Sequence, residues 1–151
     1  FGDITYQGWR DVMGTNLDSV FLVSQAALGP LRASDQAAIV NIGGMTAHKG
    51  AAHRAHVVAA KAGVVGLTKA MAHDLAMDGI TVNCVVPGLI DTQRLTAAGN
   101  ADPKHRGTAT NLLGRRGLPQ DVAAAVLYLV GPSGRYVTGE TMHVNGGAYL
   151  S

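Results

Sequence analysis

Titratable side chains are concentrated between residues 41 and 61, where an apolar run gives way to a glycine pair and then to a polar stretch. This stretch holds three histidines and ends in a lysine: His48, His53, His56 and Lys61. Imidazoles exchange protons near neutral pH, so this composition is suited to acid–base chemistry. The histidines show no clear metal-ligand spacing, and no carboxylate lies near them in sequence to orient a ring. This favours ordinary loop residues over catalytic ones, and we expect no metal site.

Two polar residues lie on apolar helical faces. From Gly8 to about Leu28 the apolar residues fall at helical intervals, and Asn16 lies inside their stripe. A second pattern with a period of 3.6 residues begins at Val57, ends at Asp78-Gly79 and contains Lys61. A buried amide without partners costs about 1 to 3 kcal/mol, whereas a lysine on an apolar stripe is usually a snorkelling side chain. Position alone therefore leaves both a structural and a functional role open for Lys61.

Three apolar runs are typical of strands, and they alternate with the helices. The run from Ala38 to Ile42 is closed by Gly43-Gly44 and has the composition of a strand buried on both faces. The others are Thr81 to Val86, stopped by Pro87-Gly88, and Gly139 to Val144. A third helix opens at Leu118-Pro119, and its inward residues are expected to be Val122, Val126, Leu127 and Val130. This alternation predicts an α/β fold with a parallel sheet, in one domain over residues 1–151.

Composition excludes several classes of protein. The chain has 47% hydrophobic and 15% charged residues, which is typical of a globular domain. Its net charge is only +2 and its basic residues are scattered, so we expect no nucleic-acid partner. No apolar run approaches the roughly 18 residues of a membrane span, so we expect no membrane partner and a cytoplasmic location. The single cysteine, Cys84, fits a reducing compartment and is expected in the core.

Four separated motifs resemble those of the short-chain dehydrogenase/reductases: T-N-L-D-S-V-F (15–21), I-V-N-I-G-G (39–44), A-A-K-A-G-V-V-G-L-T-K-A-M-A (59–72) and G-I-T-V-N-C-V-V-P-G-L-I-D-T (79–92). Two further stretches, at 114–123 and 138–149, are similar to the 3-oxoacyl-[acyl-carrier-protein] reductase branch. The resemblance covers the second half of such an enzyme, and the chain begins at Phe1 rather than at a methionine. It implies a Rossmann-like parallel sheet with flanking helices that lacks the N-terminal dinucleotide-binding half. The strand around Val40 would then present an unpaired edge.

The resemblance assigns two retained and two lost catalytic positions. Asn16 matches the asparagine that holds a proton-relay water, and Lys61 matches the lysine of Tyr-x-x-x-Lys. The tyrosine position is Val57 and the serine position is Gly44. Losing general acid–base help costs about 10² to 10⁴ in rate, and losing an oxyanion donor costs a similar factor. Classical hydride-transfer chemistry should therefore be effectively lost.

Other residues could replace or accompany these positions. His48 and His56 are possible substitutes, although at a helix start His56 points about 100° away from Val57. By resemblance, the vestigial cofactor-binding residues are Lys61, Pro87, Gly88, Ile90 and Thr92. NAD(P) is implied by the family alone, and we expect no cofactor to be bound by this chain by itself. The long segment from Asp91 to Arg116 is expected to be a flap or binding loop.

Three functions follow as hypotheses. The leading one is a degenerate, non-catalytic assembly subunit that forms a homo-oligomer or a hetero-oligomer with a homologue. In the resembled family, the helices around Asn16 and Lys61 pair across a two-fold axis, and the last strand with its preceding helix forms a second interface. The alternatives are a repurposed, cofactor-independent acid–base enzyme of isomerase, dehydratase or cyclase type, and part of an NAD(P)H-dependent oxidoreductase whose N-terminal half is absent from this sequence.

Overall fold

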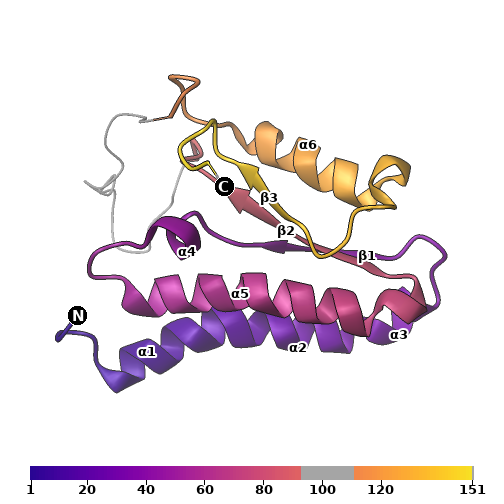
Figure 1. The fold of residues 1–151 in the computed structure, drawn as a ribbon. Coiled ribbons are helices and arrows are strands. Elements are labelled where there is room, and N and C mark those ends of the chain that lie inside the picture. Colours follow the sequence, from indigo (N-terminus) through magenta and orange to yellow (C-terminus); the bar gives the residue numbers. More distant parts are fainter. Residues whose placement is uncertain (93–110, 151) are drawn as a thin grey trace.

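A computed structural model describes residues 1–92 and 111–150. Its three strands are β1 (Ala38–Ile42), β2 (Thr81–Pro87) and β3 (Thr141–Val144). They form one parallel sheet in the order β1-β2-β3, as Figure 1 shows. The three predicted strands and the predicted parallel sheet are confirmed, although β3 begins at Thr141 rather than at Gly139.

The centre of the sheet is β2, and six of its seven residues are buried. Its alternate residues face opposite layers, as the period of a strand requires. Val82, Cys84 and Val86 therefore share one face of the sheet and pack on the α5 side, Val82 in a cluster with Ala72 and Leu75 and the other two in a cluster with Val64. Cys84 is fully buried and free, so the prediction of a core cysteine is confirmed.

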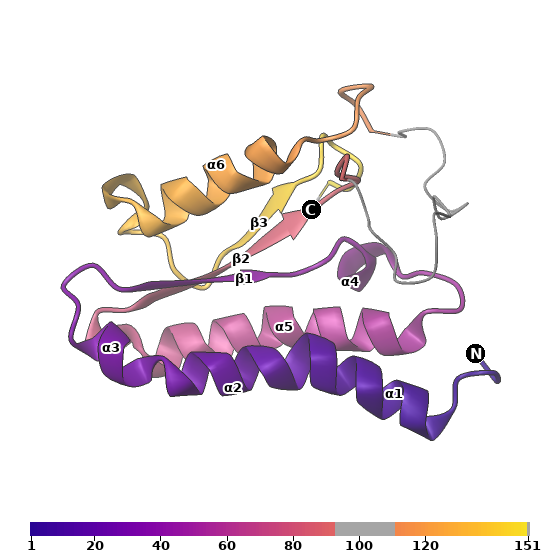
Figure 2. The same ribbon diagram turned by 180° about the vertical axis from the view of Figure 1, so that it is seen from behind.

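One face of the sheet is covered by two rows of helix. The first row comprises α1 (Tyr6–Met13), a π-helical turn (Gly14–Asp18), α2 (Ser19–Ala26) and α3 (Leu28–Arg32). The second row is α5 (Ala55–Asp74), and Figures 1 and 2 show the two rows side by side. They approach closely at Gly63, where an added Cβ would lie 2.7 Å from Leu17 Cδ2.

The ends of the first helical row differ from the prediction. The row begins at Tyr6 rather than at Gly8, because Thr5 caps it by accepting a hydrogen bond from the Gly8 N–H at 3.1 Å. It also continues past Pro30, which we expected to end it. Pro30 lies in the first turn of α3, where a backbone N–H has no helical partner and its absence costs little.

The opposite face of the sheet is covered by α6 (Pro119–Val130). Asp121 caps this helix by accepting the Leu118 N–H at 2.7 Å. The predicted inward face was partly wrong, because Leu127 is 69% exposed and Val130 is 38% exposed. Leu129 is the fully buried residue, since it follows Val122 by two helical turns and therefore shares its side.

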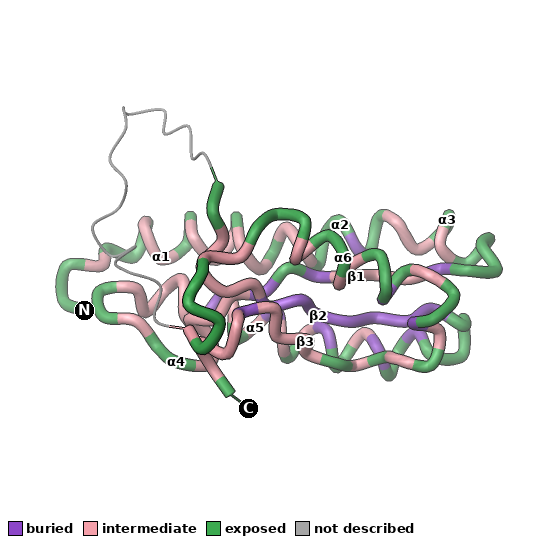
Figure 3. Tube along the Cα trace, turned by 90° about the horizontal axis from the view of Figure 1, so that it is seen from above, coloured by how far each residue is buried: buried purple, intermediate pink, exposed green. Residues whose placement is uncertain are grey.

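The edge strand β1 is less buried than predicted. Its burial on both faces was expected, yet Asn41 is its only buried residue and Ile42 is 46% exposed. The reason is that, within the described residues, β1 pairs only with β2. The expected unpaired edge is thus present in this part of the chain. Figure 3 shows the buried trace concentrated in β2.

A four-residue helix, α4 (Thr46–Lys49), connects β1 to the loop before α5. Most of the predicted flap from Asp91 to Arg116, namely residues 93–110, lies outside the described residues. In the described part of the chain, none of the helices combines the length and apolar character needed to cross a membrane.

The close approach of two loops at Gly88 gives a test of the fold. A Cβ at Gly88 would lie 2.7 Å from the Asn145 Cα, so the backbone must move to admit it. We expect Gly88→Ala to lower the free energy of unfolding by about 1 to 3 kcal/mol, as overpacking does. The control is Gly29→Ala in α3, where the added Cβ meets nothing within 4 Å. This control should be neutral or stabilising by up to about 1 kcal/mol. Equal urea-unfolding midpoints for the two variants would contradict this packing.

Candidate functional site

The site predicted from the sequence lies where β1 and β2 end, at the same edge of the sheet. The Gly43 N–H donates to the Val85 carbonyl at 2.9 Å and continues the pairing past the end of β1. A Cβ at Gly43 would lie 2.8 Å from Cys84 Sγ and 3.0 Å from Val86 Cγ2. Gly43 must therefore be a glycine, because side chains of β2 occupy the space that its own side chain would need.

The second glycine faces the retained lysine. A Cβ at Gly44 would lie 3.2 Å from Lys61 Cγ, so the structure brings these two predicted positions together. The Lys61 ammonium donates to the Ile42 carbonyl at 3.0 Å. Burial lowers the pKa of Lys61 from its ordinary 10.5, and nearby Cys84 partly opposes this by charge interaction. Lys61 is thus a functional candidate with a partly desolvated amine rather than a freely snorkelling side chain.

Asn16 and Val57 lie on the two helical rows. Asn16 is in the π-helical turn, and its side-chain amide donates to the Val12 carbonyl at 3.0 Å. Such turns are frequent at functional sites, where they redirect side chains within a helix. Val57 is half-buried in the first turn of α5. Neither Val57 nor Gly44 has a side-chain group that can exchange a proton.

The three histidines are placed in different environments. We expected ordinary loop residues, but His48 lies in α4 and His56 in the first turn of α5. His53 does lie in a loop, with a φ of 58° that is uncommon for a residue with a side chain. His53 and His56 line a cavity of about 280 Å³ with Asp3. Among the described residues, no group of three or more His, Cys, Asp or Glu is arranged to hold a metal ion.

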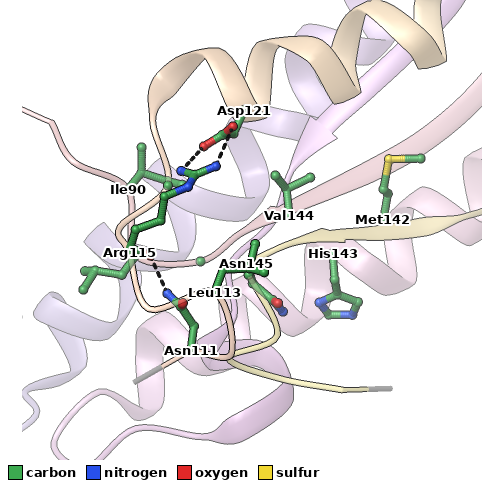
Figure 4. A pocket seen from close by; sticks show the side chains of 13 residues that line it. Ile90, Asn111, Leu113, Arg115, Asp121, Met142, His143, Val144 and Asn145 are labelled. Carbon is green, nitrogen blue, oxygen red and sulfur yellow. Dashed lines mark hydrogen bonds and ion pairs between the residues drawn. The ribbon is translucent and has the colours of Figure 1, made fainter. Parts of the chain in front are cut away.

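A separate cavity of about 320 Å³ lies between the end of β2, the start of α6 and the loop after β3 (Figure 4). Gly88 and Ile90 line it, whereas Lys61, Pro87 and Thr92 are not among its lining residues. Of the residues predicted to bind the cofactor, Gly88 and Ile90 therefore line this cavity, whereas Lys61 lies beside Gly44.

An ion pair borders this cavity. Arg115 donates to Asp121 at 2.8 Å and 3.3 Å through its two terminal nitrogens (Figure 4). The hydrogen bond from Arg115, together with the Leu118 N–H, lowers the pKa of Asp121 to about 2. The pair therefore persists across the physiological pH range and fixes the segment before α6.

The other polar residues that line this cavity or contact its lining were not predicted as site residues. They are Asn111, Arg115, Asp121, His143, Asn145 and Tyr149. Asp121 had a usable signal, because an acidic residue at the third helical position is typical of a capped helix start. His143 and Tyr149 had none, because their contacts with His48 join segments far apart in the sequence.

The lowered pKa of Lys61 can be measured directly. In a protein labelled with carbon-13 at lysine Cε, we expect the Lys61 signal to titrate with a midpoint below 10.5, because burial penalises the charged amine. Cys84→Ser should lower the midpoint further, since the charge interaction with Cys84 raises it. A Lys61 midpoint at or above 10.5 would show that the amine is fully hydrated.

Comparison with known proteins agrees with this fold. A family model described as enoyl-(acyl carrier protein) reductase matches residues 1–149. The 3-oxoacyl-[acyl-carrier-protein] reductase FabG of Vibrio cholerae serotype O1 is 44% identical over 142 residues, which are 94% of this chain and 58% of that protein. The acetoacetyl-CoA reductase of an Acinetobacter species is 39% identical over 150 residues, which are 99% of this chain and 60% of that protein.

Solved structures give the same result. The crystal structure of a blue fluorescent protein from a metagenomic library, in complex with NADPH, has a TM-score of 0.85 and 36% sequence identity. The alignment covers 97% of this chain and 58% of that one. A short-chain dehydrogenase/reductase from Brucella melitensis also has a TM-score of 0.85, at 32% identity, over 100% of this chain and 59% of that one. Together with the parallel sheet and the match over residues 1–149, these similarities show that the chain belongs to the short-chain dehydrogenase/reductase family.

Proposed function

We propose that this chain is a degenerate member of its family that has lost classical carbonyl reduction and acts as an assembly subunit. The observation that carries the proposal is an uncovered apolar face on the outer side of the helical layer formed by α2 and α5. The lost side chains at Gly44 and Val57 support the first half of the proposal, and the exposed apolar residues support the second.

The chemistry of the retained site supports loss of reduction. Lys61 is next to Gly44, where the resemblance places a serine, so the position beside the lysine has no hydroxyl to hold a carbonyl oxygen. Val57 cannot donate a proton to that oxygen. Each loss costs about 10² to 10⁴ in rate in comparable enzymes. The reductase names of the relatives therefore do not transfer to this chain as an activity.

NAD(P) is implied by the family, and one solved neighbour contains NADPH. Only the nicotinamide end has counterparts here, because the sequence has no Gly-x-x-x-Gly-x-Gly turn between a strand and a helix. Lys61 has three N–H donors, of which one is directed to the Ile42 carbonyl. The others could bind a ribose hydroxyl. Dinucleotide binding by this chain alone is not part of the proposed function.

The first apolar face lies along the groove between α2 and α5. Its lining residues are Leu17, Asp18, Phe21, Leu22, Gly63 and Leu67. Phe21 is 46% exposed and Leu22 is 57% exposed, although both are large apolar side chains. Further along α5, Gly66 opens onto free space and leaves room for the backbone of another helix to approach. A second protomer of the same family would bury this face by pairing its own two helices with these.

A second apolar face lies on the other side of the sheet. Leu127 and Tyr128 of α6 point away from the core, with 69% and 42% of their surfaces exposed. The resemblance assigns the last strand and its preceding helix to a second interface in the family. Two apolar faces on opposite layers would allow one protomer to contact two others, which supports a role in assembly.

The assembly role is tested by light scattering coupled to size-exclusion chromatography. We expect a mass of at least twice the 15.5 kDa of one chain for the chain alone. Alternatively, mixing with an equimolar 3-oxoacyl reductase should give a species heavier than the reductase by itself that contains both chains, which would show hetero-assembly. Leu22→Glu should raise the dissociation constant by about 30-fold or more, because it buries a carboxylate in the apolar face.

The matched control is Met77→Glu, which changes a residue that is 97% exposed and outside the groove. It should leave the mass unchanged. A chain that stays monomeric alone and with the reductase would contradict the proposal. Equal behaviour of the two glutamate variants would instead show that the face between α2 and α5 is not the interface.

The cavity beside His56 favours a second candidate function, cofactor-independent acid–base catalysis. His56 Nδ1 is buried and has no hydrogen-bond partner among the described residues. His56 shares the cavity with Asp3 and with His53, whose positive φ is of the kind that clusters at functional sites. Because Nδ1 is buried, proton transfer between this imidazole and a carbonyl compound in the cavity would use Nε2.

This second candidate is tested by exchange of the acidic protons of a 3-oxoacyl thioester in deuterated water without nucleotide. If it is correct, the chain accelerates exchange, and His56→Gln lowers the rate by about 10² to 10⁴ because the proton acceptor is removed. His73→Gln, at an exposed position near the end of α5, is the control and should have no effect. Exchange that is no faster than buffer, or that survives His56→Gln, would eliminate this function.

A further inference from the structure

Three aromatic rings hold the end of the described chain against α4. The His48 and His143 ring centroids are 4.6 Å apart in an edge-to-face arrangement. The Tyr149 ring lies 5.3 Å from His48 and 5.1 Å from His143. Each ring contacts the other two, and they come from α4, from β3 and from the segment after β3. We name residues 145–149, held by this cluster, the C-terminal clasp.

Polar contacts position the same segment. Lys49, the last residue of α4, donates to the Ala148 carbonyl at 3.0 Å. Asn145 donates to the Tyr149 carbonyl at 3.0 Å and accepts the Gly147 N–H at 2.8 Å. Within the described residues, the hydrogen bond that joins this segment to α4 thus comes from an exposed lysine. The Asn145 bonds shape the turn without joining it to α4. The start of the segment is held elsewhere, because the Gly146 carbonyl accepts the Leu113 N–H at 3.2 Å and the Asn145 backbone lies against Gly88. Ring packing is the main attachment of the end of the segment to α4.

In the part of the chain that the structure describes, each of the two imidazoles has a buried nitrogen that is not hydrogen-bonded. His48 Nε2 and His143 Nδ1 are both buried and have no hydrogen-bond partner among the described residues. A protonated imidazole has two N–H donors and a full charge, both of which need partners when buried. Two such charges with ring centres 4.6 Å apart would also repel each other. The cluster is compatible with at most one charged imidazole.

We propose that the C-terminal clasp is a pH-sensitive device: the neutral His48 and His143 rings hold residues 145–149 on α4, and protonation of the imidazoles releases them. This inference does not depend on the assembly role proposed above, because it concerns a different face of the molecule.

The surrounding charges give the direction of the response. Burial, and then the proximity of His48, lower the pKa of His143 from its ordinary 6.5, while Glu140, which immediately precedes β3, partly raises it. Lys49 on α4 adds a further positive charge at the clasp. Because the packed His143 binds a proton less readily than the released one, the clasp is complete above about pH 6.5 and loosens as the pH falls below it.

The clasp is connected to the predicted site through α4. The Ala47 N–H donates to the Gly44 carbonyl at 3.0 Å, so the short helix begins immediately after the glycine that faces Lys61. Release of residues 145–149 would remove the ring contacts that hold His48. It would thereby loosen the loop between β1 and α5 without disturbing the buried strand β2.

The test is backbone relaxation measured by NMR on the whole chain at pH 7.5 and pH 5.0. We expect order parameters for Ala148 and Tyr149 to fall from about 0.85 to below about 0.6 on acidification, while those of α5 stay near about 0.85. His143→Phe keeps a ring but cannot be protonated, so its clasp should remain ordered at both pH values. His48→Phe removes the repulsion between the rings but leaves His143 able to be protonated, so its clasp should loosen less than that of the wild type at pH 5.0, and it decides the question if His143→Phe fails to fold.

The control is His73→Phe, which removes a titratable group from the exposed end of α5 and should leave the wild-type response intact. A clasp that stays ordered at pH 5.0 in the wild-type chain would overturn the proposal. It would also be overturned if the segment were equally mobile at both pH values, or if both His48→Phe and His143→Phe loosened as the wild type does.

Discussion

The burial of β2 is the constraint on which the rest of the structure depends. This strand pairs on both edges, with β1 and β3, and six of its seven residues are inaccessible to water. Its backbone groups can be satisfied only by neighbouring strands, and its side chains only by a helical layer on each face. The layers of α2 with α5 and of α6 are the consequence, as Figures 1 and 2 show.

The same constraint decides which parts of the site could change. Gly43 must remain small because β2 leaves no room beside Cys84 and Val86, and Gly88 must remain small because the Asn145 backbone crosses it. Gly44 is less restricted, since the three atoms nearest to a Cβ there all belong to the flexible stem of Lys61. A side chain can therefore be lost at position 44 without loss of the fold. The fold and the side chain at position 44 can change separately, because they depend on different contacts.

The apolar surface of the molecule is distributed in the same way. Residues facing β2 are buried, whereas the outer sides of α2 and α6 keep Phe21, Leu22 and Leu127 exposed. A helix needs only one apolar stripe to pack on a sheet. The apolar residues on the outer sides of α2 and α6 are therefore not needed for that packing. The residue at position 44, just after β1, and the apolar outer faces of α2 and α6 make no use of each other's contacts.

The sequence by itself determined the strands, the long helix α5 and the membership of the family, because these depend on local periodicity and on motifs read along the chain. Its resemblance to the family also assigned Lys61 and Gly44 to one site, and the structure places them next to each other. Only the tertiary structure decided that β1 is half-exposed and that Leu129 rather than Leu127 faces the core, because burial depends on what covers an element. The contact of His48 with His143 and Tyr149 was equally beyond the sequence, since neither spacing nor composition reports which distant segments a parallel sheet brings together.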